Sequence, residues 1–243
     1  MRLGLISDIH GNLLALEAVL AELEREELDQ IVCLGDVVAG PRANESLARI
    51  RGLGCPVIMG NWDAWSVDGM PEPTGPTEEK LYDIGAYWAE RLSADDRDLI
   101  RSFVPTLEFE LAPETPLLCF HGSPNSFDHW IVATTPDEEV AAMLAGFDAP
   151  VLAGGHTHLQ MLRRYSDALF VNPGSVGLPF DLWSPEDVRI APRAEYAILT
   201  TSDGRLAIDL CRTSYDVGAH LRAGLESGMP HAEWWAASWQ HQA

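Results

Sequence analysis

Five short polar segments of this sequence carry side chains that bind divalent metals. They are Asp8-Ile9-His10, Gly35-Asp36, Gly60-Asn61, His121-Gly122 and Gly154-Gly155-His156-Thr157-His158. Together they hold two carboxylates, four imidazoles and one carboxamide, and no thiolate. Such oxygen and nitrogen ligands suit borderline divalent metals such as Mn, Fe, Co, Ni or Zn. Seven ligands are too many for one tetrahedral ion and enough for two.

Each polar segment lies at or just after an apolar run that is typical of a β-strand. These runs are Leu3–Ile6, Ile31–Leu34, Pro56–Met59, Leu117–Phe120 and Val151–Ala153. In an open α/β sheet, ligands bind outside the carboxyl ends of the strands. The spacing therefore predicts that the polar segments meet in one site.

Taken singly, most of these segments have an ordinary structural explanation. Asp8, Asp36 and Asn61 are residue types that favour turns, and Asp36 could instead cap a helix. His121 alone would be explained as a buried histidine with a hydrogen-bond partner. His156-Thr157-His158 is a stronger signal, because alternate residues of an extended segment project to one side. Five such segments in this order favour a metal site.

The order of elements predicts an α/β fold. Apolar periodicity favours a helix from Leu13 to Leu23 and another around 44–52, alternating with the first strands in a βαβ pattern. After Val151–Ala153, four further strand-like runs follow at hairpin spacing, so this half is expected to be more antiparallel. We therefore expect two mixed sheets packed as a sandwich with helices outside.

The chain has 243 residues, of which 47% are hydrophobic, and is expected to form one domain spanning 1–243. Two amphipathic helices predict a helical insertion at approximately 77–104. A helical tail is expected at approximately 215–243. Its tryptophans, Trp234, Trp235 and Trp239, could pack on their own domain or on a partner.

The formal net charge of −21 argues against binding of long nucleic acid. Small phosphorylated substrates remain compatible, because divalent cations would reverse the local potential. Four cysteines without Cys-x-x-Cys spacing favour free thiols and a reducing, cytoplasmic location. No signal peptide or membrane-spanning stretch is expected. The sequence gives no indication of the oligomeric state.

In order and context, the motifs from Asp8 to about Val176 resemble the calcineurin-like metallophosphoesterase superfamily. The longer segments Gly60-Asn61-Trp62-Asp63 and His121-Gly122-Ser123-Pro124 match its successive signatures. Asn172-Pro173-Gly174-Ser175-Val176 is similar to a signature of its bacterial phosphodiesterase-like branch. This resemblance implies a four-layer α/β/β/α sandwich.

The resemblance also implies a ligand set and a mechanism. One metal would be held by Asp8, His10, Asp36 and His158, and the other by Asp36, Asn61, His121 and His156. Asp36 would bridge two divalent ions, with manganese the first choice and Fe, Ni, Co or Zn as alternatives. A metal-bridging hydroxide positioned by Asp36 would attack phosphorus directly, without a phospho-enzyme.

Trp62 departs from the family pattern, which places a histidine after the metal-binding asparagine to protonate the leaving group. An indole neither gains nor releases a proton near neutral pH, so Trp62 cannot protonate a leaving group. Loss of a general acid disfavours poor leaving groups, since its help is commonly worth about 10²–10⁴-fold. His129 is a candidate replacement acid. Asn61, Trp62 and Arg42 are candidate substrate contacts.

These observations predict a dinuclear metal-dependent phosphoesterase acting on phosphodiester or small nucleotide-type substrates. The alternative from another class is a non-catalytic metal-binding scaffold of the same fold, of which the retromer scaffold subunit is a relative. A phosphomonoesterase or a protein phosphatase is a further alternative, and Trp62 and the acidic surface disfavour a protein-serine/threonine phosphatase.

Overall fold

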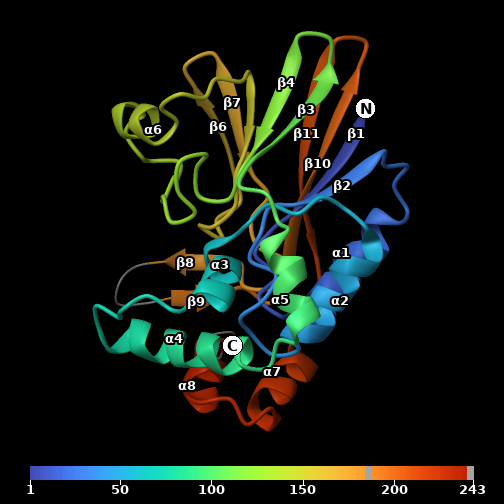
Figure 1. Ribbon diagram of the computed structural model, residues 1–243. Helices are drawn as coiled ribbons and strands as arrows, with labels where there is room; N and C mark the ends of the chain where they lie inside the picture. Colours follow the sequence, from blue (N-terminus) through green and yellow to red (C-terminus); the bar gives the residue numbers. More distant parts are fainter. Residues whose placement is uncertain (184–187, 240–243) are drawn as a thin grey trace.

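Two mixed β-sheets pack face to face in the computed structural model, which describes residues 1–183 and 188–239 (Figure 1). The first sheet has the order β11-β10-β1-β2, from β1 (Arg2–Ile6), β2 (Gln30–Cys33), β10 (Ala194–Ser202) and β11 (Arg205–Thr213). The second has the order β3-β4-β5-β7-β6, from β3 (Leu107–Ala112), β4 (Thr115–Cys119), β5 (Val151–Ala153), β6 (Met161–Tyr165) and β7 (Ala168–Asn172). A separate two-stranded sheet pairs β8 (Phe180–Trp183) with β9 (Val188–Ile190). The predicted pair of mixed sheets is confirmed.

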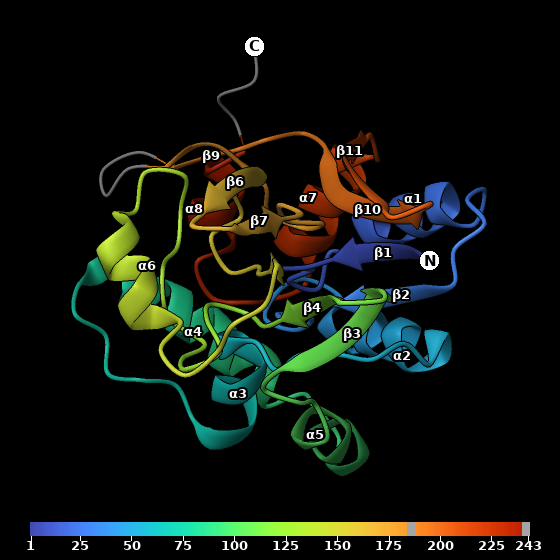
Figure 2. The same cartoon turned by 90° about the horizontal axis from the view of Figure 1, so that it is seen from above.

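Helices cover the outer side of each sheet. The eight helices of the described residues are α1 (Leu13–Leu23), α2 (Ala43–Leu53), α3 (Asn61–Asp68), α4 (Pro76–Ala89), α5 (Ala94–Arg101), α6 (Asp137–Met143), α7 (Val217–Glu226) and α8 (Ala232–Ala237). Helices α1 and α2 lie beside the first sheet and α6 beside the second, as the view from above shows (Figure 2). Helices α4, α7 and α8 gather at one end, next to β8 and β9 (Figure 1). None of the described helices combines the length and apolarity needed to cross a membrane.

Strands buried on both faces explain the continuous apolar runs in the sequence. Along β4, Leu117 and Cys119 join the core between the two sheets. Leu118 lies on the other face of this strand, and Phe120 lies just beyond its end. Both belong to the core under α6, together with Val140. This alternation follows from the two-residue period of a strand.

Two local predictions differ from the structure. The segment Pro56–Met59 forms only single bridges, Val57 to Cys33 and Ile58 to Val104, instead of a strand. Helix α3 begins directly after it and was not expected, because its sequence has no clear apolar periodicity. Its start is fixed by Asp63, whose carboxylate accepts a hydrogen bond from the backbone N–H of Gly60.

The C-terminal tryptophans pack on their own domain. Trp235 and Trp239 are buried in a cluster with Ile84, Ile190 and Met229, which joins the tail to α4 and β9. His220 of α7 is also buried, edge-on to the rings of Trp235 and Trp239 at 5.2 and 5.4 Å. Burial, with a smaller effect of Arg42, lowers the pKa of His220 to about 3. The folded protein therefore holds a neutral imidazole here.

His220→Phe should reduce the loss in the free energy of unfolding as the pH falls below neutral. Below about pH 6.5 the unfolded chain protonates His220 but the folded chain does not, so stability falls until the pH nears the folded pKa of about 3. Wild type should lose about 2 kcal/mol more than the variant between about pH 7 and about pH 5. Urea unfolding of chelator-treated protein measures this, and parallel profiles for the two proteins would refute it.

Candidate metal site

The structure brings all seven predicted ligand residues to one edge of the sandwich. Asp8 and His10 follow β1, and Asp36 follows β2. His121 follows β4, and the pair His156 and His158 follows β5; Asn61 is the first residue of α3. Two groups of possible metal-binding atoms result, each with its atoms within 4.8 Å of one another.

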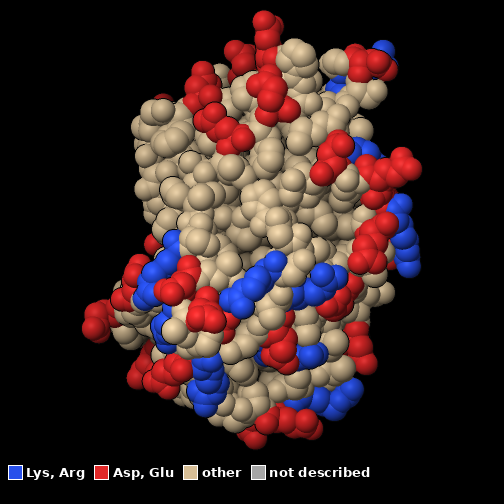
Figure 3. Space-filling view, turned by 45° about the vertical axis from the view of Figure 1, so that its right-hand side comes forward, with Lys and Arg blue, Asp and Glu red and all other residues tan. Residues whose placement is uncertain are grey.

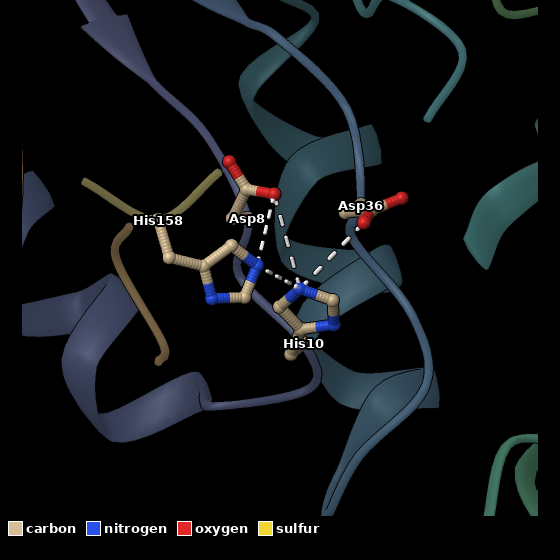
Figure 4. Close-up of side chains that lie close together, drawn as sticks. All are labelled: Asp8, His10, Asp36 and His158. Carbon is tan, nitrogen blue, oxygen red and sulfur yellow. Dashed lines mark hydrogen bonds and ion pairs between the residues drawn. The ribbon is translucent and has the colours of Figure 1, made fainter. Parts of the chain in front are cut away.

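The first group consists of Asp8, His10, Asp36 and His158 (Figure 4). Nε2 of His10 and Nε2 of His158 are 3.0 Å apart. Oδ1 of Asp8 lies 3.3 Å from Nε2 of His158, and Oδ2 of Asp36 lies 3.6 Å from Nε2 of His10. Four potential ligand atoms thus converge on one point.

The second group consists of Asp36, His121 and His156, and Asn61 joins it. Oδ2 of Asp36 lies 3.4 Å from Nε2 of His121. Oδ1 of Asn61 lies 3.0 Å from both Nε2 of His121 and Nδ1 of His156. The same oxygen of Asp36 therefore faces both groups.

One oxygen of each carboxylate is satisfied by the backbone and the other is not. Oδ2 of Asp8 accepts a hydrogen bond from the backbone N–H of His156, and Oδ1 of Asp36 accepts one from that of Trp62. Oδ1 of Asp8 and Oδ2 of Asp36 are buried without a hydrogen-bond donor. Unpaired buried carboxylate oxygens are costly, and a cation between them and the imidazoles removes this cost. The donor set fits divalent metal ions.

Backbone carbonyls set the tautomers of two histidines. Nδ1 of His121 lies 2.7 Å from the carbonyl oxygen of Leu34, and Nδ1 of His158 lies 2.8 Å from that of Leu178. Because a carbonyl only accepts, Nδ1 must carry the hydrogen in both rings. Nε2 then presents its lone pair to the cluster when the ring is neutral, as metal coordination requires.

Burial and mutual proximity shift the pKa values of four candidate ligand side chains, those of His10, Asp36, His121 and His156. Desolvation, helped by neighbouring imidazoles, lowers the pKa of His10 and of His156 to about 4, which keeps both rings neutral. Burial would also lower the pKa of His121, but Asp36 and then Asp8 raise it to about 10. Burial opposes ionisation of Asp36, yet His121 lowers its pKa overall. Without a metal, a proton on His121 supplies part of the positive charge that the carboxylates require.

Several candidate ligand residues have a left-handed backbone conformation, which is uncommon for residues other than glycine. Five ligand residues have positive φ, namely Asp8, His10, Asp36, His156 and His158. Non-glycine residues rarely adopt this region, and such outliers cluster at functional sites. Glycine permits the close approach of neighbouring loops: a Cβ on Gly60 would lie 2.1 Å from Oδ1 of Asp36.

Buried side chains behind the ligands hold these loops together. Asp63 accepts hydrogen bonds from the backbone N–H groups of Val37 and Val38, next to Asp36. Ser175 donates its hydroxyl hydrogen to the carbonyl of Asp8 at 2.7 Å. Asn172 donates to the carbonyl of Gly155, also at 2.7 Å. Asp63, Ser175 and Asn172 thus fix the loops that carry the candidate ligands.

We call the two groups of possible metal-binding residues the metal-ligand groups. A cavity of about 250 Å³ opens over them. Trp62, a predicted substrate contact, lines it together with Trp130, Phe180 and Trp235, which the sequence alone does not link to the site. The sequence gives little indication that these residues share a cavity, because each lies in a different segment and only the tertiary fold brings them together.

The predicted substrate contacts Asn61 and Arg42 and the candidate acid His129 are not among the residues that line this cavity; Asn61 instead belongs to the second group, whereas Arg42 and His129 have other partners. Arg42 donates from Nε to Oε1 of Glu45 at 3.0 Å on the surface. His129 places Nδ1 2.8 Å from the hydroxyl of Ser123. Both side chains therefore have protein partners, and roles for them in the reaction remain predictions.

Comparisons with known proteins agree with this geometry. The sequence profile of the calcineurin-like phosphoesterase superfamily domain matches residues 1–204. An uncharacterized protein of Methanocaldococcus jannaschii is 26% identical over 248 residues, covering 96% of this chain and 94% of its own.

Solved structures of full length resemble this one. A metallophosphoesterase from Sphaerobacter thermophilus has a TM-score of 0.74 at 26% identity, covering 98% of this chain and 99% of its own. A hypothetical protein from Pyrococcus horikoshii has a TM-score of 0.75 at 20% identity, covering 94% of each chain. With the family match over most of its length, this chain belongs to the calcineurin-like phosphoesterase superfamily.

Proposed function

We propose that this protein is a dinuclear metal-dependent phosphoesterase that hydrolyses phosphodiesters or small nucleotide-type substrates. The observation that carries the proposal is the unpaired Oδ2 of Asp36, which faces two groups of imidazoles at 3.4 and 3.6 Å. Asp8, His10, Asp36 and His158 would hold one ion, and Asp36, Asn61, His121 and His156 the other. We expect manganese, with iron, nickel, cobalt or zinc as alternatives.

The bound ions would activate a water molecule and neutralise the phosphate oxygens. In the reaction, the oxygen of water bonds to phosphorus while the bond from phosphorus to the leaving oxygen breaks. The attacking water releases its protons to solvent, and the leaving oxygen departs with that electron pair as an anion, which solvent then protonates if its pKa is above the pH; a phosphomonoester is the other product. The neutral rings of His10 and His156 suit a ligand role better than proton transfer.

Among the described residues that line the cavity, the ionisable ones all belong to the proposed ligand set, so none is left as an acid for the leaving group. Trp62 stands where the family has a histidine, and its ring lines the cavity. Nδ1 of His129 is already engaged by Ser123. Substrates whose leaving oxygen is stable without protonation are therefore favoured, which supports phosphodiesters with good leaving groups.

The surface charge supports a small substrate. Basic and acidic side chains are interspersed over the lower half of the face in Figure 3, without a continuous basic patch on it. With a net charge of −21, the chain would repel a long polyanion.

Asp36→Asn should abolish metal-dependent hydrolysis of bis-p-nitrophenyl phosphate and p-nitrophenyl phosphate. Removing the carboxylate that faces both groups should lower kcat/KM by at least about 10³-fold and reduce the bound metal, measured by elemental analysis. Asp209→Asn, at an exposed position of β11, is the matched control and should behave as wild type. If wild type binds two ions of Mn, Ni, Co or Fe yet hydrolyses neither ester, this result would contradict the proposed phosphoesterase activity. It would favour the alternative of a non-catalytic metal-binding scaffold.

Gly155→Ala should weaken metal binding without replacing any of the proposed ligand residues. The new Cβ would lie 2.1 Å from Oγ of Ser7 and 2.9 Å from Oδ2 of Asp8, so the Asp8 loop must shift. We expect at least about tenfold weaker binding of Mn²⁺ by calorimetry, since ligands must be held within narrow limits.

Gly52→Ala is the control, because a Cβ there meets nothing within 4 Å. It should leave metal affinity unchanged and raise stability by about 0.5–1 kcal/mol, the usual gain of alanine over glycine in a helix. Wild-type metal affinity in Gly155→Ala would show that this loop does not position a ligand.

A further inference from the structure

The cavity over the metal-ligand groups has an aromatic wall built from four distant segments. Trp62 comes from α3, Trp130 from the loop after β4, Phe180 from β8 and Trp235 from α8. We call these four side chains the aromatic wall. Leu81, Ile84 and Leu178 add apolar side chains to it. Outside the metal-ligand groups, the cavity is therefore lined by apolar and aromatic surface.

Three rings of the aromatic wall border the imidazoles of the metal-ligand groups. The ring of Phe180 stacks on His158 at 4.6 Å between centroids. Trp130 lies edge-on to His156 at 5.5 Å, and Trp62 lies edge-on to His10 at 6.3 Å. A phosphate held between the two groups would thus have aromatic surface next to its ester substituents.

The rings of the aromatic wall are held in place from behind. Trp62 packs edge-on against Trp65 at 5.1 Å and against Tyr82 at 5.9 Å. Trp235 is 7% exposed and packs against His220 at 5.2 Å. The absence of a side chain on Gly224 makes room for it, because a Cβ there would lie 2.3 Å from Cζ3 of Trp235. Rings fixed in this way bind a ligand with little loss of side-chain entropy.

The charge of the cavity restricts what it can bind. Among the described residues that line it, none is a lysine or arginine, and the ionisable ones are Asp36 and the three histidines His10, His156 and His158. A single phosphate would be matched by the metal ions, but a second phosphate or a carboxylate on the substrate would face apolar rings. Burying such an unpaired charge is costly.

Resting on the proposed function, we infer that the site selects phosphodiesters whose retained ester group, the one that does not leave, carries a planar, uncharged aromatic ring, and that the aromatic wall binds this ring. Aromatic rings stack favourably on such side chains. Trp235 lies beyond residues 1–204 that match the family, so the C-terminal tail supplies part of this selectivity. An aryl group and a nucleobase both meet the requirement.

The first test keeps the leaving group constant and varies the other ester. Manganese-loaded wild type is assayed with p-nitrophenyl phenyl phosphate, thymidine 5′-(p-nitrophenyl phosphate) and p-nitrophenyl methyl phosphate. Each kcat/KM is divided by the rate of the same ester in alkaline solution. At least one aromatic ester should exceed the methyl ester by roughly 10- to 100-fold, and whether phenyl or thymidine leads identifies the kind of ring.

The second test measures binding without turnover. Calorimetry on manganese-loaded wild type should show phenylphosphonate binding roughly tenfold or more tightly than methylphosphonate. Trp235→Leu should remove most of this preference with unchanged metal content, and Trp235→Phe should retain part of it. Trp62→Leu provides an independent variant if Trp235→Leu does not fold.

Trp234→Leu is the matched control, because Trp234 lies next in the chain, faces Lys80 and is not among the cavity residues. It should keep the preference for phenylphosphonate. Equal affinity for the two phosphonates in wild type, or the same loss in Trp234→Leu as in Trp235→Leu, would overturn the inference. Hydrolysis of all three esters at equal normalised rates would also overturn it but leave the proposed function standing, whereas no hydrolysis of any ester by metal-loaded protein would refute the proposed function itself.

Discussion

The buried carboxylate of Asp36 is the constraint on which the rest of the structure depends. Its Oδ1 accepts a hydrogen bond from the start of α3, and its Oδ2 faces the imidazoles of His10 and His121 without a donor. Its backbone carbonyl also accepts hydrogen bonds from the N–H groups of Ile9 and His10. One residue thus ties together the loops after β1 and β2, the start of α3 and both metal-ligand groups. Without a metal, a proton on His121 supplies only part of the positive charge that Oδ2 requires, and a metal ion would supply the rest.

The unfavourable backbone conformations around Asp36 lie in the loops beyond the strand ends and not in the strands themselves. The buried residues of the strands lie either in the core between the two sheets or in the cores under the helices. The loops beyond the strand ends carry positive φ at ligand residues such as Asp8 and His158. Hydrogen bonds from Ser175 and Asn172, together with the acceptor Asp63, hold these loops in place. Stability is therefore concentrated in the sandwich and conformational constraint at its edge.

The sequence was sufficient to predict that the candidate ligand residues converge, because most of them follow buried strands in a fixed order. Asp8, Asp36 and His121 each come directly after an apolar run, and parallel strand ends must meet at one edge. Helix α3 was missed since its sequence lacks apolar periodicity and its start depends on Asp63 reaching Gly60. Trp130, Phe180 and Trp235 could not be assigned, because nothing local indicates that three distant segments share one cavity. Arg42 and His129 were chosen from their place in the chain, whereas their partners Glu45 and Ser123 are visible only in the structure.

The central claim is that two metal ions share Asp36, and anomalous X-ray diffraction tests it most directly. Crystals of the manganese-loaded protein, measured at the manganese absorption edge, should show two peaks about 3.5–4 Å apart on either side of Oδ2 of Asp36. One peak should lie among Asp8, His10 and His158, and the other among Asn61, His121 and His156. A single peak, or two peaks that do not both contact Asp36, would contradict the account.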